Sequence, residues 1–193
     1  AINNREMVGA TESTVLGPFH VAGAPELPMG ANISLDGKGD SCLFDGRIVD
    51  RNDRPIEGAR LDVWCDNADG YYDVQQPDIQ PKWNNRGIFT TGPDGKYSFK
   101  GAKPVSYPIP YDGPVGQLLK KLGRHPNRPA HMHYILSAPG YKTLCTHTFV
   151  DDDVYLTSDA VFGVKASLVA HFEETPEGET QWHSPFDFVM VPG

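Results

Sequence analysis

Short runs of alternating apolar and polar residues, separated by turn-forming residues, recur along this chain. The runs at 87–91 and 96–99 flank Gly-Pro-Asp-Gly, in which proline presets one backbone angle and glycine accepts left-handed conformations. Many short strands joined by such turns predict an antiparallel β-sandwich or barrel. The strands are expected at residues 43–50, 60–65, 87–91, 96–99, 130–137, 141–150, 165–172 and 186–191.

Composition supports a single β-rich domain with little helix. The 193 residues include 20 glycines and 17 prolines, which favours many turns over long helices. One short helix is predicted at 115–123, because Val115, Leu118 and Leu122 recur at helical spacing before Gly123. A helical bundle is therefore excluded.

Charge and cysteine content exclude several classes of partner. The 17 Lys and Arg residues, against 25 Asp and Glu, give a net charge of −8 and form no basic stripe, so no nucleic-acid partner is expected. No apolar run reaches the ~18 residues of a membrane span, and the N-terminus has no export signal, so no membrane partner is expected. Cys42, Cys65 and Cys145 are far apart and in no metal-binding spacing, which indicates a reducing, cytoplasmic setting.

The chain divides into two segments of different character. Residues 1–40 are rich in Gly and Pro and show little periodicity, so they are expected to form an extended segment that packs on the core. Residues 41–193 carry the predicted strands and should form the β domain. Because the chain begins with Ala-Ile-Asn-Asn, as if a longer sequence were entered midway, a missing upstream segment is also expected.

His131 and His133 lie two residues apart in a predicted strand, so their side chains project from the same face. Two imidazoles placed in this way can bind one metal ion. Two half-buried histidines without a metal are the alternative. A third histidine, His147, lies on the next predicted strand, where strand pairing makes it a neighbour of the pair as readily as a third ligand of a zinc-type site. No glutamate between His133 and Glu173 provides the ligand of a cupin-like site.

Tyrosines provide candidate oxygen ligands. Tyr71 and Tyr72 follow a turn after the strand at 60–65, and Tyr107 lies in a Pro-rich loop that restricts its freedom. A bound metal can stabilise the phenolate form of tyrosine, although each ring taken alone could simply be half-buried. Two phenolates and two imidazoles would form a hard, anionic ligand set suited to ferric iron.

Several longer segments resemble the intradiol ring-cleaving dioxygenases, whose iron-site signature is Tyr, Tyr, Arg and His-x-His in this order. The segments that carry the resemblance are GYYDVQ (70–75), YPIPYDGPVG (107–116), GRHPNRPAHMHY (123–134) and APGYKTLCTHTF (138–149). Residues 11–20 and 158–169 look most like the hydroxyquinol branch of this family. The resemblance covers nearly the whole chain.

The resemblance implies a fold and a site. The fold would be an all-β, transthyretin-like antiparallel β-sandwich with long loops and one short helix, holding one non-haem ferric iron per chain. The implied iron ligands are Tyr72, Tyr107, His131 and His133. Arg128 would stabilise charge that develops on the substrate ring, and His147 would hydrogen-bond an oxygen of the reacting group. The implied substrate-binding residues are Val15, Leu16, Gly17, Pro18, Ile109, Pro110 and Val161.

The resemblance also implies an activity. The enzyme would cleave hydroxyquinol with O2 between its ortho hydroxyls, giving 3-hydroxy-cis,cis-muconate or maleylacetate in aromatic degradation, and Tyr107 would leave the metal to take up a phenolic proton. Catechol or chlorocatechol is the alternative substrate. Family members form homodimers through an N-terminal helical domain that would precede this chain, so dimer formation is expected to depend on it. Two other classes remain open: a non-catalytic β-sandwich binding module, and a zinc hydrolase that uses His131, His133 and His147.

Overall fold

The computed structural model describes residues 8–176 and 178–193. Two five-stranded sheets and one two-stranded ribbon account for its strands. The strands are β1 (Ser41–Val49), β2 (Arg60–Trp64), β3 (Arg86–Thr90), β4 (Lys96–Ala102), β5 (Tyr107–Pro108), β6 (Asn127–Arg128), β7 (His131–Ser137), β8 (Leu144–Val150), β9 (Val169–Ala170), β10 (Glu173–Glu174), β11 (Trp182–Pro185) and β12 (Phe188–Val189). The helical segments are α1 (Pro114–Lys121) and the 3-10 turns η2 (Asp73–Gln75) and η3 (Ala166–Leu168).

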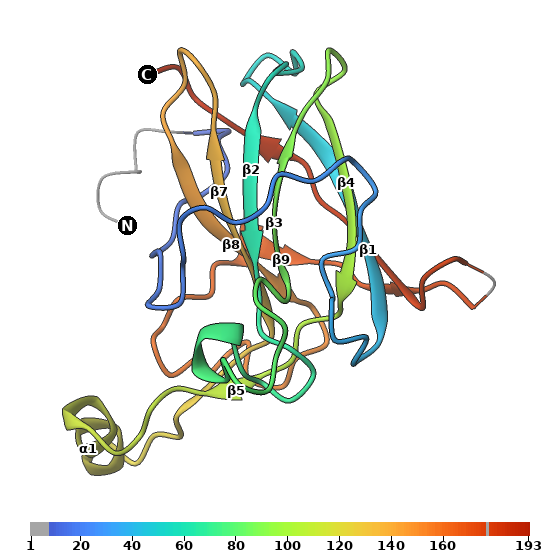
Figure 1. The fold of residues 1–193 in the computed structure, drawn as a ribbon. Coiled ribbons are helices and arrows are strands. Elements are labelled where there is room, and N and C mark those ends of the chain that lie inside the picture. The colour runs from blue at the N-terminus through green and yellow to red at the C-terminus, as the bar shows by residue number, and fades with distance from the viewer. Residues whose placement is uncertain (1–7, 177) are drawn as a thin grey trace.

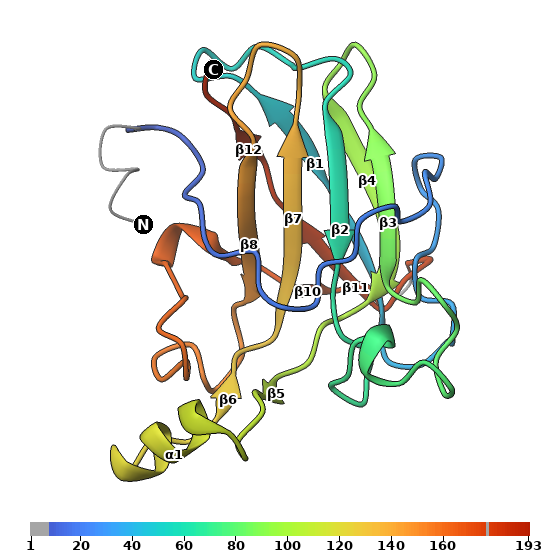
Figure 2. The same ribbon diagram turned by 60° about the vertical axis from the view of Figure 1, so that its left-hand side comes forward.

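The two larger sheets pack face to face as a sandwich (Figure 2). One has the order β3-β2-β7-β8-β9, and in the other β1 pairs with β4, β11 and β12. The core lies between the sheets, and β7 shows how the sequence builds it. Met132, Tyr134 and Leu136 are buried in this core. Because strand side chains alternate between faces, His131 and His133 point to the outer face of the same sheet.

The N-terminal segment covers that outer face. Figure 2 shows it crossing in front of β8, β7, β2 and β3. Its backbone hydrogen-bonds to both sheets: Thr14 N donates to Cys145 O on β8, and Ile33 N donates to Lys100 O on β4. Residues 1–7 lie outside the described residues, and the expected division of the chain at residue 40 stays a prediction.

The sequence pattern predicted an antiparallel sandwich, and most strand pairs are antiparallel, but some are parallel. β1 pairs in parallel with β11 and β12, and β8 pairs in parallel with β9. The strand expected at 165–172 is η3 followed by the two residues of β9, and the strand expected at 186–191 is reduced to β12. These C-terminal pieces follow existing strands as short additions. Gly46 lies between the stretches of β1 that pair with β11 and with β12, and there the chain comes so close that a Cβ would lie 2.0 Å from Phe186 O.

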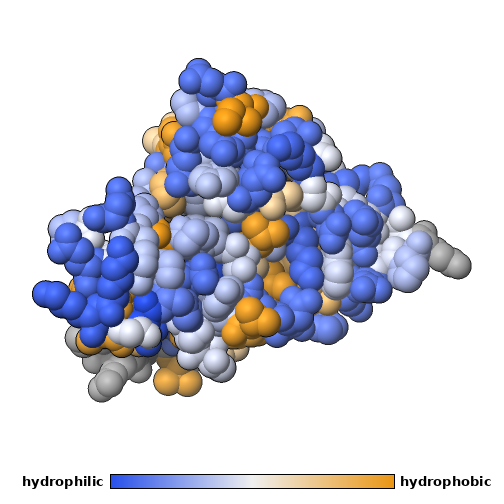
Figure 3. Space-filling view, turned by 90° about the horizontal axis from the view of Figure 1, so that it is seen from below, coloured by the Kyte–Doolittle hydropathy of each residue, from blue (hydrophilic) through white to orange (hydrophobic). Residues whose placement is uncertain are grey.

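The predicted helix is present as α1. It begins at Pro114, and Gly123 just beyond its end has a φ of +64°, the left-handed conformation that terminates many helices. Figure 1 shows α1 projecting from the sandwich, and Val115, Leu118 and Leu122 are exposed. Figure 3 shows the end of the molecule that carries α1, where hydrophobic residues form small separate patches among hydrophilic ones. Within the described residues, no helix is long and apolar enough to cross a membrane.

Candidate metal centre

Four side chains from three parts of the fold bring their donor atoms together. His131 and His133 come from β7, Tyr72 immediately precedes η2, and Tyr107 begins β5. The Nε2 atoms of the two histidines are 3.2 Å apart, and Tyr72 Oη lies 3.2 Å from His133 Nε2. Tyr107 Oη lies 3.4 Å from Tyr72 Oη. All four residues are buried.

The two histidine side chains are better arranged to bind one metal ion than to hydrogen-bond to each other. His131 Nδ1 donates to Pro129 O at 2.7 Å, so its Nε2 carries a lone pair. Burial lowers the pKa of both imidazoles well below the usual value, which keeps them neutral. Neighbouring ligands bound at about 2.1 Å around one ion at tetrahedral angles lie about 3.4 Å apart. The donor spacings of 3.2–3.4 Å therefore match a shared cation.

The two phenols need a cation to ionise. Burial raises the pKa of Tyr72 well above its usual value, and the neighbouring Tyr107 raises it further. Burial also raises the pKa of Tyr107, but the positive charge of Arg128 acts in the opposite direction. A metal ion between the two oxygens would supply the charge that stabilises phenolates. Tyr71, next to Tyr72 in the chain, is 46% exposed.

Arg128 and His147 complete the cluster. Arg128 lies on β6 directly opposite Tyr107, and its Nη1 donates to His131 Nε2 at 3.1 Å. His147 lies on β8 opposite His133, with Nδ1 2.6 Å from Thr14 Oγ1. Burial lowers the pKa of His147 to about 3, and its Nε2 is buried without a hydrogen-bond partner. The structure thus gathers every predicted ligand and catalytic residue in one place.

The three-histidine alternative is also visible. Ligand atoms of His131, His133 and His147 lie within 4.8 Å of one another. The Tyr72 hydroxyl lies closer, at 3.2 Å from His133 Nε2, so the donor atoms of the four-residue set are more tightly spaced than those of the three histidines. We therefore take the Tyr72, Tyr107, His131 and His133 set as the better candidate centre.

Aromatic residues that sequence reasoning missed hold the ligands in place. Trp64 stacks on His133 with ring centroids 4.6 Å apart, and Phe19 stacks on Tyr72 at 4.5 Å. Gly17 touches the site from the covering segment, because a Cβ there would lie 3.1 Å from His133 Cε1. Phe19 directly follows a predicted substrate-binding run, which is a usable signal, whereas Trp64 faces His133 only through the register of β2 and β7.

A cavity of about 360 Å³ opens beside the centre. Its lining residues are Ser13, Thr14, Val15, His147, Val161, Phe162, Gly163 and Lys165. Val15 and Val161 line this cavity together with His147, and their contact with a substrate stays a prediction. Ile109 packs against the cluster of Trp64, Tyr72 and Tyr107 instead. Leu16, Pro18 and Pro110 are exposed and do not line this cavity, so their contact with a substrate stays a prediction.

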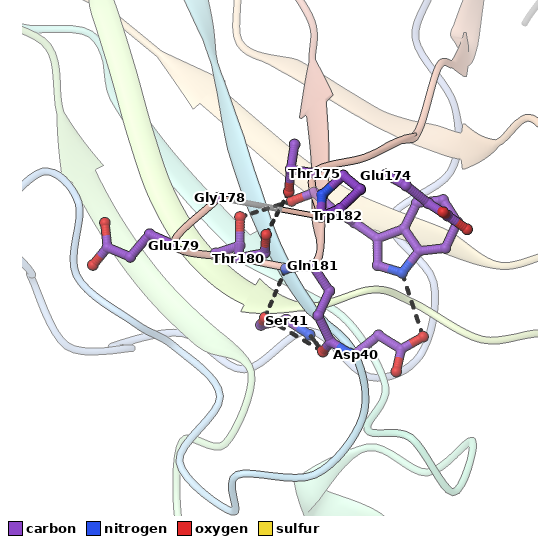
Figure 4. Close-up of a pocket in the computed structure, with 10 residues that line it drawn as sticks. Asp40, Ser41, Glu174, Thr175, Gly178, Glu179, Thr180, Gln181 and Trp182 are labelled. Carbon is purple, nitrogen blue, oxygen red and sulfur yellow. Dashed lines mark hydrogen bonds between the residues drawn. The ribbon is translucent and has the colours of Figure 1, made fainter.

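A second pocket lies at the start of β1 beside the turn between β10 and β11 (Figure 4). Ser41 and Gln181 hydrogen-bond across it, and Trp182 Nε1 donates to Asp40 Oδ2 at 3.4 Å. None of the four candidate metal ligands lines this pocket. The cavity beside His147 is therefore the better candidate for a substrate.

Comparisons with known proteins agree with this assignment. A family model described as "Dioxygenase" matches residues 16–192. Hydroxyquinol 1,2-dioxygenase from Rhizobium sp. (strain MTP-10005) is 58% identical over 201 residues, covering 99% of this chain and 68% of the relative. Catechol 1,2-dioxygenase from Candida albicans is 42% identical over 177 residues, covering 89% of this chain and 57% of the relative.

The solved structure of hydroxyquinol 1,2-dioxygenase from Pseudomonas putida DLL-E4 superposes with a TM-score of 0.94 at 43% identity, covering 100% of this chain and 70% of that one. The chain thus spans 57–70% of the length of these relatives. The family match over most of the chain and the 58% identity together mean that the chain belongs to the intradiol ring-cleavage dioxygenase family.

Proposed function

We propose that this protein is a ferric-iron dioxygenase that cleaves hydroxyquinol between its ortho hydroxyls with O2, yielding 3-hydroxy-cis,cis-muconate or maleylacetate. The convergence of two tyrosine oxygens with two histidine nitrogens carries the proposal, because such a mixed set with two hard oxygen ligands favours ferric iron over zinc. The 58% identity to a hydroxyquinol 1,2-dioxygenase supports the choice of substrate.

Tyr72, Tyr107, His131 and His133 would hold the iron. Ferric iron held there would supply a Lewis acid and electron acceptor that activates a bound aromatic diol toward O2. The protein's part is to present neutral imidazoles and ionisable phenols in a dry site. Trp64 and Phe19 restrict the ligand rings by stacking on His133 and Tyr72.

Tyr107 is the better of the two tyrosines for handling a proton. Its ring is slightly exposed, whereas Tyr72 is fully buried. Burial raises the pKa of both phenols, but Arg128 opposes that effect only at Tyr107. We propose that Tyr107 Oη takes up a proton from a substrate hydroxyl as the substrate binds, which keeps the net charge of the buried site unchanged.

Arg128 and His147 would act on the bound ring. The buried Arg128 guanidinium places a fixed positive charge beside the ligands, where negative charge develops on the substrate. His147 Nε2, buried and without a partner, is available for a hydrogen bond to a reacting oxygen. Val15 and Val161 supply apolar surface to the cavity beside it.

Visible absorption with metal analysis tests the centre. A red-brown protein with one iron per chain, whose band shifts when a catechol is added without O2, is expected. A colourless zinc protein would instead support a hydrolase based on His131, His133 and His147. A protein that stays colourless after iron is supplied would support a non-catalytic binding module.

Steady-state oxygen uptake with hydroxyquinol, catechol and chlorocatechol tests the substrate. The highest kcat/KM is expected with hydroxyquinol. A clear preference for catechol or chlorocatechol would overturn the substrate assignment and leave the ring-cleavage class intact.

We also propose a cytoplasmic, homodimeric enzyme. The three cysteines are free thiols, which suits a reducing compartment. Family membership supports the homodimer, which is expected to depend on the N-terminal helical domain of family members, and light scattering of the protein with and without that domain is the measurement that checks it.

A further inference from the structure

Arg128 is held by an acid that the sequence analysis did not single out. Its Nε donates to Asp159 Oδ1 at 3.3 Å, and both side chains are almost fully buried. A buried guanidinium needs such a partner, because an uncompensated charge is costly in a dry environment. Arg128 Nη2 is buried without a hydrogen-bond partner, so Asp159 leaves this donor of the guanidinium free.

The same carboxylate also fixes the loop that lines the cavity. Asp159 Oδ1 accepts a hydrogen bond from Val161 N at 3.2 Å, and Oδ2 accepts one from Gly163 N at 2.8 Å. Both residues line the cavity beside His147. Asp159 therefore connects the wall of the cavity directly to Arg128.

The loop adopts a conformation that needs such support. Phe162, between the two anchored residues, has a φ of +56°, which is rare for an aromatic residue. Strained backbone of this kind persists where surrounding contacts determine it. Phe162 N donates to the Asp159 carbonyl, and the Arg124 guanidinium lies over the Phe162 ring at 4.1 Å.

Arg128 and the loop are also in close contact. A Cβ at Gly163 would lie 3.1 Å from Arg128 Nη2 and 3.1 Å from Asp159 Oδ2. Both distances are shorter than an ordinary van der Waals contact, so a side chain at this position would press on the ion pair. The loop therefore contacts the guanidinium directly and is also joined to it through Asp159.

We infer that Asp159 is a positioning residue, which holds the Arg128 guanidinium and the 161–163 wall in one fixed arrangement for the substrate ring. This inference rests on the proposed function, because it assumes that Arg128 acts on a substrate in this cavity. The Asp159 carboxylate does not line the cavity itself; it accepts hydrogen bonds from Arg128, Val161 and Gly163, and it acts through Arg128 and the loop.

A double-mutant cycle in the iron-loaded protein tests the inference. The variants are Asp159→Asn, Arg128→Lys and the combination, with kcat/KM for hydroxyquinol and the anaerobic dissociation constant of catechol as readouts. Asp159→Asn is expected to lower kcat/KM by about tenfold or more in the Arg128 protein, with iron content and visible band unchanged. In the Arg128→Lys background the same change should cost less than about threefold.

Asp187→Asn is the matched control. Asp187 also accepts hydrogen bonds from a guanidinium and a backbone N–H, both of Arg47, but it lies beside β12 and is partly exposed. Its kcat/KM should equal that of the wild type. An equal loss from Asp159→Asn in both Arg128 backgrounds, or no loss at all, would overturn the inference.

Gly163→Ala decides the matter if Asp159→Asn does not fold. The added methyl group would press on Arg128 Nη2 without removing any charge. A severalfold loss of kcat/KM is expected with Arg128 present and little loss with Lys at that position, whereas equal losses would contradict the inference. The wild type is measured in the same assays, so failure of the proposed function would appear in the wild type and failure of this inference only in the variants.

Discussion

Gly17→Ala probes how the N-terminal segment supports the metal centre. Gly17 has a φ of +76°, and a Cβ there would lie 3.1 Å from His133 Cε1. The left-handed backbone should cost alanine about 1–2 kcal/mol of folding free energy. The contact adds a second effect, because the methyl group must push the His133 ring. Trp64 stacks on that ring with centroids 4.6 Å apart and restricts its movement.

Gly23→Ala separates these two effects. Gly23 has a φ of +86° but nothing within 4 Å of an added Cβ, so it carries the backbone cost alone. Both variants should lose a similar free energy of unfolding in urea, measured on the metal-free protein. Only Gly17→Ala should weaken iron binding, by about tenfold in competition with a chelator, and shift the visible band.

The comparison has a clear refuting outcome. If Gly17→Ala and Gly23→Ala bind iron equally well and show the same spectrum, the covering segment does not position His133. If Gly23→Ala loses no stability, the backbone argument fails as well.

Three further predictions follow from the same geometry. His133→Asn should lose most of its iron and colour while keeping its melting temperature within a few degrees, as measured by metal analysis and calorimetry. In the metal-free protein, burial lowers the pKa of His147 to about 3, below its usual 6.5, so the unfolded chain takes up a proton first and stability should fall as the pH drops below about 6.5. His147→Gln should make that part of a urea-unfolding profile less steep, and the remaining slope comes from His131 and His133, whose pKa values burial also lowers. Arg86→Leu strands the buried Asp73 carboxylate, now paired at 2.6 Å, and should cost about 3 kcal/mol in urea unfolding; a loss below ~1 kcal/mol would contradict this reading.

Local periodicity predicts the sandwich and the shared face of the two histidines, whereas the tyrosine ligands, which lie in loops, were implied by the family resemblance alone. Alternation along 130–137 places Met132 and Tyr134 in the core and the two histidines on the opposite face, as the structure confirms. The turn at 92–95 and the end of α1 at Gly123 are likewise encoded by residues with restricted or unusual backbone angles.

Non-local contacts were beyond the sequence pattern. The parallel pairing of β1 with β11 and β12 joins segments more than 130 residues apart, and no local period reports it. Asp159 reads as one more acid in a loop until the fold places it against Arg128. Leu16, Pro18 and Pro110, placed at the substrate by resemblance alone, are exposed beside the site.

The histidines of β7 face away from the core. The stability of the fold and the exclusion of water from the metal centre therefore depend on different parts of the chain. The residues between the sheets stabilise the sandwich, whereas the exclusion of water from the metal centre depends on the N-terminal segment that covers the outer face of the sheet. Substitutions in the N-terminal segment can therefore change the shape of the site while the core between the sheets stays the same. Proteolytic cleavage within the N-terminal segment should likewise abolish activity and leave the sandwich folded.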